Sequence, residues 1–236
     1  MKKLLPSFAG AVGLVAYITP KTIHLAHAGD VRCVAQSTDG QIHSTMDHQA
    51  ETPSEAARLR KEHPGEEDTV VCLRKGEEPS ADGQQPPLRV IGLLMPSRSF
   101  GDAHSKWSVE WQEKLKPILE FFPTAKRLGI APLCKTPPYI TAHPDITPLP
   151  HPGQRFLVIS TDGITDSLSS EDIASTVSST LATEDSQNKN LAGILARKAL
   201  GGGKFDDEEA GRRLALEGRE RREWRDDITV LVVVFE

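Results

Sequence analysis

Residues 156–167, FLVISTDGITDS, pass from a short apolar run directly into a turn that carries two carboxylates, Asp162 and Asp166. A few consecutive apolar residues bounded by turn residues are typical of a buried β-strand. A carboxylate at the end of such a strand costs several kcal/mol unless a partner neutralises it. The sequence therefore predicts a strand whose end faces a positively charged partner.

Two further acidic positions lie next to apolar segments. Asp226 and Asp227 precede ITVLVVVF, residues 228–235, whose β-branched composition predicts a strand buried on both faces. Asp30 lies within IHLAHAGDVRCV, residues 23–34, between the apolar segments of a predicted hairpin. The repeated pairing of an apolar strand with an acid indicates a shared partner.

Two kinds of partner fit these acids. Arg32 and Arg225 are adjacent in sequence and would form ion pairs with them. A hard divalent cation is the other candidate, because Mg²⁺ and Mn²⁺ take oxygen ligands, keep several waters and need only a few carboxylates. Taken singly, each acid is more often a turn residue or an ion pair. Taken together, and with Asp166 beside one of them, they favour the cation.

The composition narrows the class of protein. At 236 residues, with 38% hydrophobic and 26% charged residues, the chain is long enough for one large globular domain or two small ones. A formal charge of −5 argues against a nucleic-acid partner, which usually requires a basic face. Cys33, Cys72 and Cys134 show neither metal-binding nor disulfide spacing, which favours a reducing compartment.

The N-terminus permits two interpretations. Two lysines followed by the apolar stretch 4–18, with Ala26-His27-Ala28 downstream, are similar to a secretory signal. However, Pro6 interrupts the stretch, which is also too short to span a bilayer. We favour a core strand at residues 9–18, so we expect neither secretion nor a membrane span.

The first half of the chain is predicted to contain two strands and a helix. The strands are expected at residues 9–18 and 22–36, joined by a turn at residues 19–22. Thr52-Pro53-Ser54-Glu55 matches a capping box with proline at the first helical position. This pattern predicts a helix that continues to Glu62.

The second half is predicted to be mainly helical before its last strands. A helix is expected at residues 105–122, where an apolar stripe places Trp107 and Trp111 in the core. The proline-rich stretch 132–152 is expected to be an extended connection. Three further helical segments are expected: one capped by Ser169 and Asp172, one at residues 191–200, and the charge-rich segment 206–223. We interpret the last as a solvated helix face in preference to a partner surface.

One class of phosphatase is excluded by the opening segment. Haloacid-dehalogenase phosphatases follow an apolar strand with D-x-D-G-T, in which the first aspartate is the nucleophile. Ser160 occupies that position in this chain. A phospho-aspartate mechanism therefore lacks its nucleophile.

Several segments together resemble the metal-dependent protein phosphatases of type 2C, in order and spacing from residue 9 to the C-terminus. They are AHAGDVRCV (26–34), Asp47-His48, GLLMPSRSFGD (92–102), FLVISTDGITD (156–166) and WRDDITVLVVVF (224–235). The resemblance implies a single domain over residues 1–236 with an α+β fold. In that fold two packed antiparallel β-sheets are flanked by helices, a four-layer αββα sandwich, here incomplete at its N-terminus.

The resemblance also implies a metal site. Asp162 and Asp226 match ligands of a two-metal pair, while Asp30 and Asp166 match acids associated with a third, weaker metal. The expected cofactors are Mg²⁺ or Mn²⁺. The implied mechanism is attack of a metal-activated water on the phosphorus of phosphoserine or phosphothreonine.

Three more residues match supporting positions of the family. Asp227 occupies a place where asparagine is common and is expected to lie next to the ligands. Asp102 and Arg98 are expected to be structural supports. The implied mechanism needs no protein nucleophile.

Within the family, a subset of segments resembles the pyruvate dehydrogenase phosphatases. These are EHPGE (62–66), RVIGLLMPSRSFGDAHSKWSVEWQEKLK (89–116) and TPPYITAHPDIT (136–147). Those enzymes act in the mitochondrial matrix on phosphoserine of the pyruvate dehydrogenase E1 component. The resemblance implies that phosphoprotein as substrate and the matrix as location; without it a cytoplasmic location is expected.

Part of the family pattern has no match in this sequence. The first metal-binding half of the family carries a glutamate-aspartate pair, a D-G-H-G-G turn, a phosphate-holding arginine and a proton-donating histidine. Two interpretations follow: a fragment or truncated gene model of an active enzyme, which we favour, or a phosphatase-like binding module without catalysis. In both we expect weak binding of manganese and slow hydrolysis.

Overall fold

The computed structural model describes residues 5–79, 83, 85–119, 133–183, 189–218, 221, 224 and 226–235. The chain divides into two compact units. Unit 1 comprises Met1–Gly13, Ala28–Asp30 and Asp47–Pro144, and unit 2 comprises Leu14–His27, Val31–Met46 and Asp145–Glu236. The two units are described in turn.

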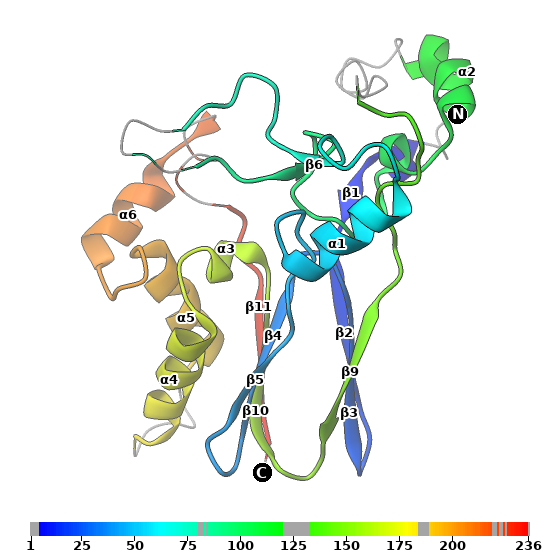
Figure 1. The fold of residues 1–236 in the computed structure, drawn as a ribbon. Coiled ribbons are helices and arrows are strands. Elements are labelled where there is room, and N and C mark those ends of the chain that lie inside the picture. Colours follow the sequence, from blue (N-terminus) through cyan, green and yellow to red (C-terminus); the bar gives the residue numbers. More distant parts are fainter. Residues whose placement is uncertain are drawn as a thin grey trace. The chain divides into compact units, whose positions relative to one another are not determined.

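Unit 2 is built on a four-stranded sheet with the order β11-β10-β4-β5 (Figure 1). Its strands are β4 (Arg32–Ser37), β5 (Ile42–Ser44), β10 (Gln154–Ser160) and β11 (Val230–Val234). Every pair is antiparallel, with Ser160 opposite both Arg32 and Val230. The apolar run of the opening segment is thus the central strand β10, and its end meets the beginnings of both neighbouring strands.

A second, three-stranded sheet has the order β2-β3-β9. Its strands are β2 (Gly13–Ile18), β3 (Thr22–Ala28) and β9 (Asp145–Pro150). One hydrophobic cluster joins the two sheets, since it contains Ile23 and Leu25 from β3 together with Cys33 from β4 and Leu157 from β10. The sheets therefore pack face to face, as the antiparallel α+β fold expected from the sequence requires.

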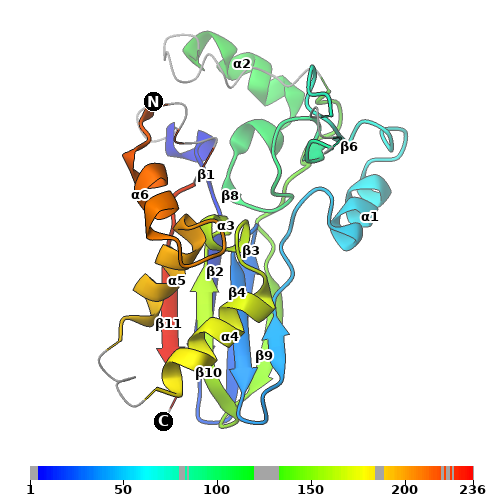
Figure 2. The same ribbon diagram turned by 90° about the vertical axis from the view of Figure 1, so that its left-hand side faces the viewer.

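Helices cover the other face of the four-stranded sheet (Figure 2). They are α3 (Asp162–Thr165), α4 (Ser170–Leu181) and α5 (Leu191–Leu200). Helix α6 (Asp207–Ala215) packs against α5. Phe156 and Val158 of β10 share a buried cluster with Ile173 of α4 and Leu195 of α5. The predicted capping box of α4 is present, because Ser169 and Asp172 bond reciprocally, and α5 has the predicted bounds.

The predicted core strand at residues 9–18 is only partly buried. Residues 10–11 and 13–18 form two separate strands, and β2 lies at the edge of its sheet. Leu14 packs on the core between the sheets, whereas Val15 and Tyr17 are 65% and 66% exposed. Alternation along a strand explains this, because only every second side chain faces the core. In the described part of unit 2, no helix covers this outer face.

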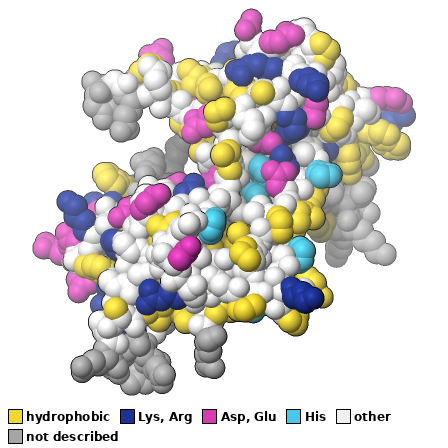
Figure 3. All heavy atoms as spheres, turned by 60° about the horizontal axis from the view of Figure 1, so that its bottom comes forward, with side chains coloured by type: hydrophobic (Ala, Val, Ile, Leu, Met, Phe, Trp, Pro, Cys, Tyr) yellow, Lys and Arg dark blue, Asp and Glu magenta, His cyan; other side chains and the backbone are white. Residues whose placement is uncertain are grey.

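Other strand predictions also need correction. Residues 22–36 are two strands in different sheets, separated at Gly29. The strand predicted at 228–235 to be buried on both faces is an edge strand, and Leu231 on β11 is 56% exposed. Residues 145–150 of the expected connection form β9. Figure 3 shows hydrophobic side chains interspersed with charged ones on the face that it draws.

Unit 1 has little regular structure. Its helical elements are η1 (Leu5–Phe8), α1 (Pro53–Glu62), η2 (Ala103–Ser105) and α2 (Val109–Leu119), and its strands are β1 (Gly10–Ala11), β6 (Val71–Cys72), β7 (Arg89–Val90) and β8 (Phe100–Gly101). Strand β1 pairs with β8, and β6 pairs with β7. Leu59 of α1 packs with Val70, Val90 and Tyr139 in the main core of the unit.

Two helix predictions in unit 1 are wrong in detail. Helix α1 has the predicted bounds, but Thr52 makes no side-chain capping bond and Glu55 is instead buried against Arg98. The helix predicted at 105–122 begins at Val109; residues 120–122 lie outside the described residues. Trp111, expected in the core, is 57% exposed. The regular spacing of apolar residues in this segment therefore did not predict which face of α2 is buried.

No helix in the described ranges has the length and apolar character needed to cross a membrane.

Candidate metal centre

The end of β10 places two predicted ligands one helical turn apart. Asp162 is the first residue of α3, and the backbone amide of Asp166 donates to its carbonyl oxygen at 2.8 Å. The carboxylate of Asp162 accepts a hydrogen bond from the amide of Gly163 at 2.9 Å. Asp162 is half-buried and Asp166 is exposed. The turn after β10 thus carries two acids that start from the same end of the sheet.

The chain before β11 is fastened to this turn through Thr161. The amide of Thr161 donates to the carbonyl of Thr229 at 3.0 Å, and its hydroxyl donates to the carbonyl of Asp227 at 3.2 Å. A Cβ atom on Gly163 would lie 2.7 Å from that same carbonyl of Asp227, so only glycine permits the close approach. Asp226 is therefore held at the same end of the four-stranded sheet as Asp162.

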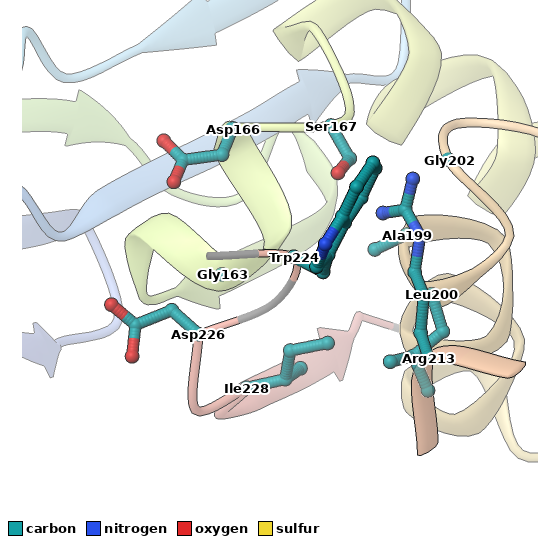
Figure 4. Close-up of a pocket in the computed structure, with 10 residues that line it drawn as sticks. All are labelled: Gly163, Asp166, Ser167, Ala199, Leu200, Gly202, Arg213, Trp224, Asp226 and Ile228. Carbon is teal, nitrogen blue, oxygen red and sulfur yellow. The ribbon is translucent and has the colours of Figure 1, made fainter. Parts of the chain in front are cut away.

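A cavity of about 510 Å³ lies at this end of unit 2. Asp166 and Asp226 both line it, and their carboxylates extend to the same side (Figure 4). The guanidinium of Arg213 lies on the opposite side, with the indole of Trp224 between them. The cavity therefore has an acidic end and a basic end, separated by an aromatic ring.

The charge at the basic end is balanced within α6. Glu209 accepts from Arg213 at 2.6 Å and from Arg212 at 2.7 Å and 2.8 Å. Hydrogen bonds from Arg212 and then Arg213 lower the pKa of Glu209 to about 2. Arg212 also lies over the ring of Trp224, 5.0 Å from its centroid. This cluster orders the wall of the cavity, and it falls in a segment expected only to be a solvated helix.

The acids at the end of the sheet fit a hard cation in part. Their donor atoms are carboxylate oxygens, the ligands that Mg²⁺ and Mn²⁺ prefer. Asp226 is exposed, its carboxylate also accepting from the amide of Asp227 at 2.7 Å. Within the described ranges, no three His, Cys, Asp or Glu side chains form a group that would hold a metal by itself. A cation bound here would thus take few protein ligands and keep several waters.

Asp30 belongs to unit 1 and is buried there, with 7% of its surface exposed. It follows Gly29, whose carbonyl and amide both bond to His48. Asp30 precedes β4 by two residues in sequence. Its predicted position beside Asp162 and Asp166 remains a prediction, because these belong to the other unit.

The predicted supporting residues of unit 1 are buried in polar contacts. Arg98 forms an ion pair with Glu55 at 2.6 Å and donates to the carbonyl of His143 at 3.1 Å. Asp102 has a positive φ of 49° and accepts from the hydroxyl of Ser99 at 2.5 Å. Through these contacts Arg98 and Asp102 hold the loops of unit 1 in place.

Asp227 and two residues that sequence reasoning did not place at the site also lie at this end of unit 2. Asp227 is exposed and lies 3.9 Å from the guanidinium of Arg221. Arg225, the alternative partner of the acids, lies outside the described residues. Arg213 and Trp224, which line the cavity, were not singled out by sequence reasoning. The signal for Arg213 was the charge-rich composition of residues 206–223, and Trp224 is the first residue of the family-like segment 224–235.

The comparisons with known proteins agree with this architecture. A family model, protein phosphatase 2C, matches residues 1–206. The human mitochondrial pyruvate dehydrogenase (acetyl-transferring) phosphatase 2 is 32% identical over 271 residues, which cover 97% of this chain and 48% of that protein. A protein phosphatase 2C homolog of Schizosaccharomyces pombe is 33% identical over 270 residues, covering 99% of this chain and 54% of the homolog.

A solved structure shows the same fold at low identity. The serine-threonine phosphatase 2C of Toxoplasma gondii superimposes with a TM-score of 0.55 and 17% identity, over 100% of this chain and 61% of that one. The chain spans about half the length of the curated relatives named above. The family match over most of its residues nevertheless shows that the chain belongs to the protein phosphatase 2C family.

Proposed function

We propose that this chain serves in the metal-dependent hydrolysis of phosphoserine and phosphothreonine in proteins. The observation that carries the proposal is the meeting of β10 and β11 at one end of the sheet, where Asp166 and Asp226 line one cavity. Asp162 and Asp226 would hold the catalytic cations, and Asp166 and Asp30, which belong to different units, are each proposed as a ligand of a weaker cation. Membership of the protein phosphatase 2C family supports this assignment.

The residues of the chain would act by binding and positioning. The carboxylates of Asp162 and Asp226 each accept a hydrogen bond from the next backbone amide, so little reorganisation is needed on binding. Bound Mg²⁺ or Mn²⁺ supplies Lewis-acid chemistry, lowering the pKa of a water and offsetting the charge of the phosphate. The hydrogen bonds of Thr161 keep the two strand ends together while the phosphoprotein binds. No side-chain nucleophile takes part.

A mitochondrial phosphoprotein is the proposed substrate. Residues 89–116 and 136–147 resemble pyruvate dehydrogenase phosphatases, and a human mitochondrial phosphatase of that name is similar over nearly the whole chain. The proposed substrate is accordingly the E1 component of pyruvate dehydrogenase, and the proposed location is the mitochondrial matrix.

Hydrolysis of a phosphoserine peptide in the presence of Mn²⁺ tests the proposal. We expect slow, metal-dependent turnover that falls more than about 100-fold in Asp226→Asn, because even outer partners of metal ligands are worth 10–100-fold. Asp207→Asn is the matched control, since this aspartate is exposed on α6 and pairs only loosely with Arg197 at 3.5 Å. Turnover that survives Asp226→Asn, or that falls equally in both variants, would refute the assigned role.

A further inference from the structure

The turn that carries Asp30 is fixed in an unusual backbone conformation. Gly29 has a φ of +102°, a region that side chains other than glycine rarely adopt. A Cβ atom at this position would lie 2.2 Å from Cγ1 of Val12 and 3.0 Å from the carbonyl oxygen of Arg98. The turn is therefore closely packed on two sides, and Asp30 begins from a restricted position.

His48 forms hydrogen bonds with both backbone groups of Gly29 in this turn. The amide of His48 donates to the carbonyl of Gly29 at 3.0 Å, and the amide of Gly29 donates to Nδ1 of His48 at 3.3 Å. His48 is 3% exposed. Since Nδ1 accepts a hydrogen bond, the ring is in the tautomer with its proton on Nε2. The side chain of His48 thus replaces a backbone partner for the amide next to Asp30.

His48 is itself fixed from helix α1. Its carbonyl accepts from the amide of Ser97 at 2.8 Å, and the hydroxyl of Ser97 donates to Glu55 at 2.6 Å. Glu55 also accepts from Arg98 at 2.6 Å and 3.1 Å. A chain of buried hydrogen bonds therefore runs from α1 through the segment 97–98 to the turn of Asp30.

We propose that His48 is a positioning residue that orients Asp30 for a divalent cation. The inference rests on the proposed function, in which Asp30 serves the weaker metal site. A carboxylate whose backbone is fixed before binding loses less conformational entropy when it binds. Without the bond to Nδ1, the amide of Gly29 would lose its buried partner and the turn would relax. Binding a cation would then have to fix the carboxylate of Asp30, and this loss of conformational entropy would weaken the affinity for the cation.

Titration of the intact chain with Mn²⁺ tests the role of His48. In His48→Leu we expect affinity for the weaker site to fall about tenfold, the lower end of the effect of removing an outer partner. His48→Asn should restore most of it, because the amide oxygen of asparagine can occupy the place of Nδ1. If His48→Leu does not fold, His48→Gln replaces it, since glutamine keeps polarity but moves the acceptor.

A second buried histidine provides the matched control. His63 is also 3% exposed, bonds to Thr136 through Nδ1 at 2.8 Å and stacks on Tyr139. His63→Leu should lower the melting temperature but leave affinity for Mn²⁺ unchanged. A similar loss of affinity in both histidine variants would show a general effect of destabilisation and overturn the proposal.

Asp30→Asn separates this inference from the proposed function. If Asp30→Asn leaves Mn²⁺ affinity unchanged, the assigned role of Asp30 fails. If Asp30→Asn weakens binding while His48→Leu does not, the metal role stands and the positioning role is overturned. The expected result is that each single variant weakens binding and that His48→Leu adds nothing in the Asp30→Asn background.

Discussion

Unit 2 buries apolar side chains between regular layers, whereas unit 1 buries a network of charged side chains beside its apolar core. The interior of unit 2 contains Phe156, Leu157 and Val158 of β10, all fully buried. In unit 1 the carboxylate of Glu55 is 3% exposed and accepts hydrogen bonds from Arg58, Ser97 and Arg98. The first kind of interior depends on packing, and the second on exact polar pairing.

This difference extends to the predicted metal ligands. Asp162 follows β10 by two residues and Asp226 precedes β11 by four, and the register of these strands is fixed by hydrophobic packing. Asp30 lies on a turn held by Gly29 and His48. Mutations that loosen the core should therefore affect the first pair through global stability, while mutations in the polar network should act on Asp30 directly.

The largest effect is expected in the core of unit 2. Phe156→Ala should lower the free energy of unfolding by about 4 kcal/mol, because it removes a fully buried ring between β10 and the helices. Phe205→Ala, at a ring that is 62% exposed, should change it little. Chemical denaturation of both variants measures the difference. Equal losses would contradict the assignment of Phe156 to the core.

The next effect concerns the polar interior of unit 1. Glu55→Gln should cost about 3 kcal/mol, since it leaves the buried guanidinium of Arg98 without its counter-charge. Glu62→Gln is the control, because Glu62 binds Arg58 at 2.7 Å from an exposed position. Denaturation that affects both variants equally would show that the buried network has no special role.

The contribution of Glu55 to the stability of the fold should decrease as the pH is lowered. Burial raises the pKa of Glu55, but hydrogen bonds from Arg98, Arg58 and Ser97 outweigh it and lower the value from 4.5 to about 2. The stabilisation is therefore fully present above about pH 4.5 and is lost as the pH falls towards 2. Stability curves of the wild type and Glu55→Gln should converge over that interval. Parallel curves would contradict the assigned pKa.

Regular elements with repeated patterns could be predicted from the sequence. Residues 191–200 form a helix with the predicted bounds, the helix after Ser169 has the predicted cap, and the strand at 156–160 lies in the core. Each carries its own local signal: an apolar period, a capping side chain or a β-branched run. Asp162 and Asp166 could be recognised as candidate ligands because these two acids follow closely after the apolar run of β10.

Positions decided by tertiary contacts could not be predicted. Glu55 matches a capping box as a local pattern, yet its carboxylate is used by Arg98, 43 residues away. Strand β11 is as apolar as β10, but only its place at the sheet edge exposes Leu231. Local helix and strand propensities are weak predictors of such positions, because residues distant in the sequence decide their contacts and their burial.

A smaller effect is expected at the cap of α4. Ser169→Ala should lower stability by about 1 kcal/mol, because the hydroxyl accepts from the amide of Asp172 at 3.0 Å. Ser175→Ala removes a hydroxyl from the same helix that bonds within the turn, and should be close to neutral. Thermal unfolding distinguishes the two, and a neutral Ser169→Ala would contradict the role of the cap.

The smallest effect tests the exposed face of α2. Trp111→Ser should change the free energy of unfolding by no more than about 0.5 kcal/mol, because more than half of the side chain is exposed. A loss of several kcal/mol would instead support the core position expected from the stripe of apolar residues. Denaturant unfolding of the variant measures which position is correct.

The central claim is that the ends of β10 and β11 together bind a divalent cation. Its most direct test is titration of the purified chain with Mn²⁺, followed by electron paramagnetic resonance of the free ion. We predict weak binding in the wild type and in Asp207→Asn, and at least about tenfold weaker binding in Asp162→Asn and Asp226→Asn. Unchanged affinity in those two variants, with the fold intact, would contradict the account.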